Sequence, residues 1–188
     1  DWVRISQFPM VFKLRGGSGS SNVWLVKSRL QAVRFIKKAF DKGFSSYNKL
    51  HDLKEQIRRF KFKNRELINF LKSIRRMFVS TQYANIVGRH RGYVLFQKYF
   101  ENNTYDIRVV VIGGRAFAIK RLVRNNDFRA SGSGHIIYDR DQIDERCVKI
   151  AFETSGKLRA NCLAYDFVFD SRGNPFIVEI NYGYDHCA

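Results

Sequence analysis

The chain has 188 residues, of which 45% are apolar, and a formal charge of +17 at pH 7. This length and apolar content allow one substantial core or two small lobes, which excludes an intrinsically disordered chain. No run approaches the roughly 18 consecutive apolar residues of a membrane-spanning helix, and the first residues do not form a signal peptide.

The first predicted unit is a strand, a glycine-rich loop and a second strand. The strands are predicted over residues 9–14 and 23–26, and the loop over 15–22 is rich in Gly and Ser. Its backbone N–H groups and hydroxyls suit phosphate oxygens, and Lys13 adds positive charge. A glycine-rich hairpin without a ligand is the alternative. Neither a P-loop nor a dinucleotide fingerprint is present, since both need a different glycine spacing before a helix.

A helical region follows the second strand. Ser28 and Gln31 predict a capping box, and the apolar stripe that follows ends near Gly43. The pattern stays helical from Tyr47 to about Phe78, which predicts two further helices.

Most of the positive charge lies in this helical region. Residues 27–91 contain 18 Lys or Arg against four acidic residues. Such a segment suits nucleic acid, an acidic substrate or a membrane surface. Solvated helix faces are the alternative, because charge runs of this kind are common on helices without a ligand.

The middle of the chain predicts a strand, a hairpin and a helix. An apolar strand is predicted over residues 93–101, where the last positions are polar. Strands over 106–112 and 115–121 flank a Gly-Gly turn, the signature of a tight hairpin. An amphipathic helix is predicted over 141–158.

Charged residues follow the strands of this hairpin. Asp106 and Arg108 share one face, because side chains two apart on a strand point the same way. Lys120 and Arg121 are adjacent, so each projects from a different face. Arg129, in the following loop, precedes small donors and suits an anion; a plain flexible connector is the alternative.

The last predicted element is a second hairpin with two facing carboxylates. If residues 171–174 form a four-residue loop, Asp170 pairs with Pro175 and Asp166 lies opposite Glu179. Two carboxylates facing each other repel, and a cation relieves the repulsion.

The oxygen ligands of this hairpin suit Mg²⁺ or Mn²⁺. Asn181 lies on the same face as Asp166 and Glu179 and completes an all-oxygen set. A solvated hairpin face is the alternative. Cys147, Cys162 and Cys187 show neither zinc-site nor disulfide spacing, which favours a cytoplasmic location.

The order of these elements resembles the ATP-grasp superfamily of ATP-dependent carboxylate-amine ligases, which includes the bacterial ligases that add glutamate to a ribosomal protein. The resemblance runs from about Pro9 to Asn181, apart from the basic helical stretch. It implies nucleotide binding by one set of residues: Lys13, Gly16, Gly17, Gly19, Gln97, Lys98, Tyr99, Phe100 and Glu101. It implies that Arg108, Lys120 and Arg129 act on phosphates or substrate carboxylate. Asp166, Glu179 and Asn181 match the magnesium ligands.

The resemblance also implies a fold and a reaction. The expected fold is α+β, with an N-terminal lobe over residues 1–92, which includes a basic helical insertion at about 43–90, and a C-terminal lobe over 93–188. ATP would lie in the cleft between the lobes. The γ-phosphate would pass to a carboxylate, and an amine would displace it. Since the chain begins at Asp1 without a methionine, we expect a fragment that lacks the family's earlier domain.

The substrates stay open at this point. The tail and the basic helices resemble ATP-grasp proteins of cell-surface polysaccharide biosynthesis, which suggests an acidic polymer or sugar acid as a partner. The alternatives are a nucleotide-binding module without ligase activity and a nucleic-acid-binding protein that uses residues 27–91. Scattered His residues give no grouping for nucleophilic catalysis, and the oligomeric state is not predicted.

Overall fold

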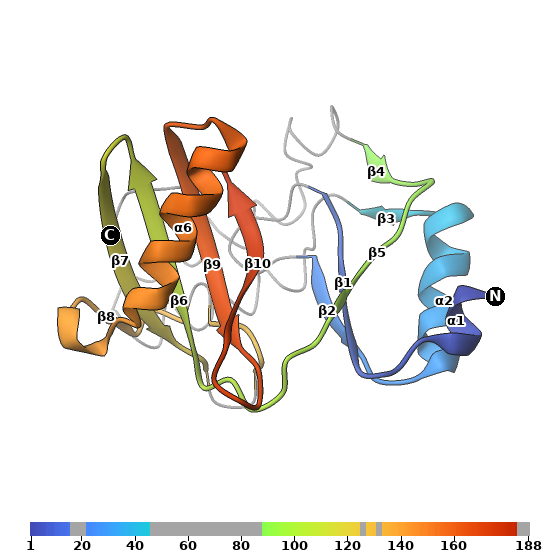
Figure 1. Ribbon diagram of the computed structural model, residues 1–188. Coiled ribbons are helices and arrows are strands. Elements are labelled where there is room, and N and C mark those ends of the chain that lie inside the picture. The colour runs from blue at the N-terminus through green and yellow to red at the C-terminus, as the bar shows by residue number, and fades with distance from the viewer. Residues whose placement is uncertain (16–21, 46–87, 125–126, 131–132, 184–188) are drawn as a thin grey trace, which may run out of the picture. The chain divides into compact units, whose positions relative to one another are not determined.

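The computed structural model describes residues 1–15, 22–45, 88–124, 127–130 and 133–183 (Figure 1). The chain divides into two compact units, Asp1–Tyr99 and Phe100–Ala188. Both units combine helices with antiparallel sheets, so the predicted α+β class is confirmed.

Unit 1 contains a three-stranded antiparallel sheet in the order β2-β1-β5. Its elements are α1 (Trp2–Ile5), β1 (Met10–Lys13), β2 (Val23–Val26), α2 (Arg29–Phe40), β3 (Phe44–Ser45), β4 (Arg89–His90) and β5 (Leu95–Lys98). The central strand β1 pairs Lys13 with Val23 on one side and with Leu95 on the other.

The core of unit 1 is built around an aromatic ring on β1. Phe12 is fully buried, and its ring centroid lies 5.0–5.9 Å from four other rings. These are the rings of Trp24, Phe35, Phe44 and Phe96. Aromatic pairs at this separation add to the burial of apolar area, so β1 is held firmly up to Lys13.

Helix α2 begins and ends where the sequence predicts. The Ser28 hydroxyl accepts a hydrogen bond from the Gln31 N–H at 3.3 Å, and the Gln31 side chain accepts one from the Lys27 N–H at 2.8 Å. At the other end, Gly43 has φ +68°, and a Cβ there would lie 2.7 Å from the His90 carbonyl oxygen. Glycine is therefore required at this turn.

The two short strands β3 and β4 join the ends of a long segment. Phe44 pairs with His90 and Ser45 with Arg89, and the Arg89 side chain donates to the carbonyls of Lys42 and Gly43 at 2.6 and 2.9 Å. The helices predicted between Tyr47 and Phe78 lie outside the described residues.

Unit 2 contains a five-stranded antiparallel sheet in the order β10-β9-β6-β7-β8. Its elements are β6 (Tyr105–Ile112), β7 (Arg115–Leu122), β8 (Ile136–Ile137), the 3-10 helix η1 (Arg140–Gln142), α6 (Glu145–Leu158), β9 (Cys162–Phe169) and β10 (Pro175–Asn181). Helix α6 lies across one face of this sheet, over β6 and β9 (Figure 1).

The core of unit 2 lies between α6 and that face. Alternate residues of β6 and β9 point toward the helix and are buried, as the period of two in a strand requires. The buried set consists of Ile107, Val109, Val111, Cys147, Ala151, Leu163, Tyr165 and Phe167. The remaining positions of β6 and β9, including Asp106, Arg108 and Asp166, therefore point to the opposite face. We call this the polar face.

Two predicted elements are shorter in the structure. Helix α6 begins at Glu145, not at residue 141, because the Asp144 carboxylate caps it by accepting from the Arg146 N–H at 2.9 Å. The strand predicted over 93–101 is only β5, and it pairs with β1. The predicted domain boundary between residues 92 and 93 lies before β5, whereas the structure places β5 in unit 1.

Candidate functional site

The β9–β10 hairpin brings two carboxylates to opposite positions. Asp166 pairs with Glu179, as predicted, and Asn181 pairs with Ala164 on the same face. The predicted pairing of Asp170 with Pro175 is wrong, because Pro175 pairs with Phe169.

The hairpin tip explains this difference. Asp170 belongs to the loop, where its N–H donates to the Asn174 carbonyl at 3.0 Å and its carboxylate accepts from the N–H groups of Arg172 and Asn174 at 2.9 and 2.8 Å. Gly173, with φ +74°, completes a five-residue loop in place of the predicted four.

A register shift then restores the predicted pairing. The register moves by one residue between Ile177 and Glu179, which is a β-bulge. Without this shift Glu179 would lie opposite Tyr165, on the face that α6 covers. The bulge therefore places Glu179 on the polar face beside Asp166.

Four charged side chains form an ion cluster on the polar face: Asp106, Arg108, Arg121 and Asp166. Arg108 binds both oxygens of Asp166, with Nε–Oδ1 and Nη2–Oδ2 distances of 2.6 and 2.7 Å. Arg121 binds both oxygens of Asp106 at 2.7 and 2.6 Å, and its Nη2 also lies 3.1 Å from Asp166 Oδ2. The cluster is neutral overall, and Asp106, Arg121 and Asp166 are all buried.

The number of guanidinium groups at each carboxylate sets its pKa. Burial, the largest effect, acts to raise the pKa of Asp166, but the hydrogen bonds and charges of Arg108 and Arg121 outweigh it and lower the pKa below its usual value. Asp106 has one guanidinium contact, so burial prevails and its pKa is raised. Asp166 is thus held as a carboxylate.

The oxygen donors of the hairpin fit a hard divalent cation in type. Glu179 is exposed, and Asn181 accepts a hydrogen bond from the Gly183 N–H at 2.9 Å. Among the residues that the structure describes, no group of three or more His, Cys, Asp or Glu side chains could hold a metal ion. A site here would therefore consist of two carboxylates and the Asn181 amide, and Asp166 would exchange an arginine contact for the cation.

Lys120 is not brought together with this cluster. It pairs with Ile107 and lies on the face that α6 covers, where its Nζ donates to Gln142 at 3.1 Å and lies 4.2 Å from the centre of the Tyr105 ring. Its neighbour Arg121 occupies the polar face instead. The catalytic role predicted for Lys120 stays a prediction.

The ion pair between Asp106 and Arg121 was not among the sequence-based predictions, although a signal for it exists. A two-residue Gly113-Gly114 turn fixes the hairpin register, and counting back from it pairs Asp106 with Arg121, as observed. The pairing of Arg108 with Asp166 depends on a second register, that of β6 with β9, which this turn does not fix.

The other predicted residues are distributed over both units. Arg129 binds both oxygens of Asp127 at 2.8–3.2 Å. Lys13, Gln97, Lys98 and Tyr99 belong to unit 1, whereas Phe100 and Glu101 begin unit 2. Gly16, Gly17 and Gly19 lie outside the described residues.

Comparison with known protein families identifies the family of this chain. Residues 69–185, more than half of its length, match the RimK-like ATP-grasp domain. The chain belongs to the RimK-like ATP-grasp family. The resemblance inferred from the order of the motifs is therefore confirmed, and with it the α+β ATP-grasp fold.

Solved structures of ATP-grasp proteins share this fold. The biotin carboxylase domain of 2-oxoglutarate carboxylase from Hydrogenobacter thermophilus, bound to MgADP, ADP and bicarbonate, superimposes with a TM-score of 0.55 at 14% identity, over 98% of this chain and 34% of that one. Biotin carboxylase from Campylobacter jejuni, in complex with an ATP compound, gives 0.50 at 13% identity, over 96% and 32%.

This ATP-grasp chain thus spans about a third of the length of those structures. No curated protein sequence matches the chain significantly. None of the helices in its described parts is both long and apolar enough to cross a membrane.

Proposed function

We propose that this chain carries out ATP-dependent ligation of a carboxylate to an amine through an acyl phosphate. The observation that carries the proposal is the pairing of Asp166 with Glu179 beside Arg108 on the polar face of a RimK-like ATP-grasp chain. Phosphoryl transfer depends chiefly on positioning and charge neutralisation, and this face supplies carboxylates for a cation and guanidinium groups for anions.

The proposed metal ligands are Asp166, Glu179 and Asn181. A bound Mg²⁺ or Mn²⁺ would neutralise phosphate charge and orient the nucleotide. Both cations prefer oxygen donors, and all three side chains offer them. Because Arg108 holds both oxygens of Asp166, this arginine would move toward the transferring phosphoryl group or the acyl phosphate as the cation binds.

The proposed nucleotide-binding residues are those that the order of the motifs implies. Lys13 and the glycines of the 16–19 loop would bind phosphates, and residues 97–100 would bracket adenine. Glu101 would accept hydrogen bonds from the ribose hydroxyls. The support is their order along the chain relative to the carboxylate hairpin, together with membership of the family.

The reaction would proceed in two balanced steps. A substrate carboxylate oxygen attacks the γ-phosphorus of ATP, the bond to the bridging oxygen breaks, and ADP leaves. The amine then attacks the acyl carbon, phosphate leaves, and the amine loses a proton. Arg129 would bind the substrate carboxylate. Lys120 could contact the phosphates or the acyl phosphate only if β7 presented its side chain on the polar face.

The proposed substrate class is an acidic polymer or sugar acid, with cell-surface polysaccharide as one candidate. The support is the concentration of Lys and Arg in residues 27–91, which would attract polyanions.

The test is substrate-dependent ADP release by the purified chain with MgATP, across panels of amino acids, sugar acids and acidic polymers. Release that requires both a carboxylate and an amine supports the ligase. ATP binding without such release would indicate a nucleotide-binding module. Absence of ATP binding, together with salt-sensitive binding of nucleic acid, would overturn the proposal.

A further inference from the structure

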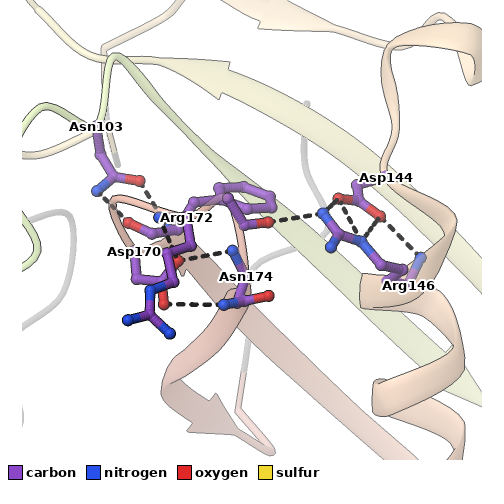
Figure 2. A network of polar contacts seen from close by, with 8 residues as sticks. Asn103, Asp144, Arg146, Asp170, Arg172 and Asn174 are labelled. Carbon is purple, nitrogen blue, oxygen red and sulfur yellow. Dashed lines mark hydrogen bonds and ion pairs between the residues drawn. The ribbon is translucent and has the colours of Figure 1, made fainter.

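One asparagine connects the first residues of unit 2 to the end of strand β9. The Asn103 side-chain N–H₂ donates to the carbonyls of Phe169, Phe100 and Glu101 at 2.9, 3.1 and 3.3 Å. Its Oδ1 accepts from the Phe169 N–H at 2.8 Å. Figure 2 shows this amide beside the β9–β10 hairpin.

The Asn103 side chain takes the place of a peptide group of a neighbouring strand. A side-chain amide has the same donor and acceptor as a peptide group, so Asn103 engages both backbone groups of Phe169 as a neighbouring strand would. Asn102, with φ +62°, makes the turn before it; Asn is among the non-glycine residues that tolerate this conformation. The chain then enters β6, which begins at Tyr105.

A ring contact holds the same segment to the second strand of the hairpin. The ring centroids of Phe100 and Phe176 lie 4.9 Å apart, with an interplanar angle of 30°. Residues 100 and 101 are therefore fixed to β9 by Asn103 and to β10 by Phe176.

The hairpin is itself fixed at its tip. The Arg146 side chain donates to the Gly173 carbonyl at 2.7 Å and forms an ion pair with Asp144 at 2.6 Å, which ties the tip to the start of α6 (Figure 2). Asp166 and Glu179 lie on the same two strands. The segment with Phe100 and Glu101 thus has a defined place relative to both carboxylates.

We propose that Asn103 is a positioning residue that sets the base-binding segment of the nucleotide site relative to the metal-binding hairpin. This inference rests on the proposed function, in which Phe100 and Glu101 contact the base and ribose while Asp166 and Glu179 hold the cation. A nucleotide spans both groups, so a shift of about 1 Å in one of them weakens binding strongly.

The experiment compares nucleotides that differ only in the base. Dissociation constants of MgATP and MgGTP are measured by calorimetry for the purified chain and for Asn103→Ala. Phosphates and cation are identical in the two nucleotides, so the ratio of the constants reports on base positioning alone. Asn174→Ala is the matched control, because Asn174 bonds to Asp170 in the hairpin tip and makes none of the Asn103 contacts.

The expected result is a preference of the unaltered chain for ATP that falls about tenfold in Asn103→Ala and stays within about twofold in Asn174→Ala. Asn103→Asp keeps the acceptor for the Phe169 N–H but loses the three donated bonds. It should show the same fall, which keeps the test valid if the alanine variant does not fold.

The possible outcomes distinguish a failure of this inference from a failure of the proposed function. If the unaltered chain binds neither nucleotide, the proposed function fails. If it binds both without preference, or if the Asn103 variants keep the ATP preference or weaken both nucleotides equally, Asn103 is a structural residue only and the inference is overturned.

Discussion

Arg108 holds both carboxylate oxygens of Asp166, at 2.6 and 2.7 Å, across two neighbouring strands of the unit 2 sheet. A predicted catalytic cation and a predicted metal ligand are thus partners of each other. The contact joins β6 to β9 through the charged residues of the polar face.

Asp166→Asn should destabilise the chain. The variant leaves Arg108 and the buried Arg121 with one carboxylate fewer, and unpairing a buried ion pair typically costs about 3 kcal/mol. Urea unfolding of the isolated chain measures the change. Glu179→Gln is the matched control, since Glu179 is exposed and its substitution should change the free energy of unfolding by less than about 0.5 kcal/mol. Equal stability of the two variants would mean that the ion cluster contributes little.

Deleting Val178 should preserve the metal-binding arrangement. Val178 is the extra residue of the bulge, so without it Glu179 follows Ile177 directly and still pairs with Asp166 on the polar face. We expect Mg²⁺-dependent nucleotide binding within about twofold of the unaltered chain, measured by calorimetry. Val178→Ala, which keeps the residue count, is the control and should bind equally well. Loss of Mg²⁺-dependent binding in the deletion variant alone would show that the pairing of Glu179 with Asp166 is not sufficient and that the bulge itself is required.

The ion cluster and the β-bulge differ in how far they could be predicted from the sequence. The opposition of Asp166 and Glu179 followed from the alternation of the strands, but it is reached through a longer loop and a bulge that compensate each other. Local residue types do not reveal a bulge at Val178, because it arises from the packing of Ile177 into the core and from the hydrogen bonds of Asp170 at the tip.

For the ion cluster, the strand register was predictable from the sequence, but the face of the sheet was not. Its register could be counted from the Gly113-Gly114 turn, yet the choice between Lys120 and Arg121 depends on which face α6 covers. That is a property of the assembled sheet, in which β9 inserts beside β6 after a long stretch of chain.

Acid should destabilise the chain in part through Asp144. The hydrogen bond from Arg146 lowers the pKa of Asp144, with burial acting in the opposite direction. A carboxyl whose folded pKa is lowered contributes stability above its unfolded pKa, about 3.9, and loses it as the pH falls through the folded value. Asn caps a helix as well as Asp does, so Asp144→Asn removes the titration and keeps the cap. The melting temperature of the variant should fall less steeply than that of the unaltered chain below about pH 4; parallel curves would refute this role.

Cys147 should resist alkylation in the folded chain. Burial raises the pKa of its thiol to about 12, so almost no reactive thiolate exists at pH 8. Cys162 is exposed and should react with iodoacetamide under the same conditions. Peptide mapping by mass spectrometry distinguishes the two sites, and urea should make Cys147 reactive. Rapid labelling of native Cys147 would contradict the packing of α6 on the sheet.

The central claim is that Asp166 and Glu179 form a cation site that serves a nucleotide. Calorimetric titration of ATP into the purified chain, with Mg²⁺ and then with EDTA, tests it most directly when repeated with Glu179→Gln. We expect Mg²⁺ to strengthen ATP binding by the unaltered chain at least tenfold, and Glu179→Gln, with unchanged stability, to lose that dependence. Binding that is equally strong in EDTA, or a Glu179→Gln variant that responds to Mg²⁺ as the unaltered chain does, would contradict the claim.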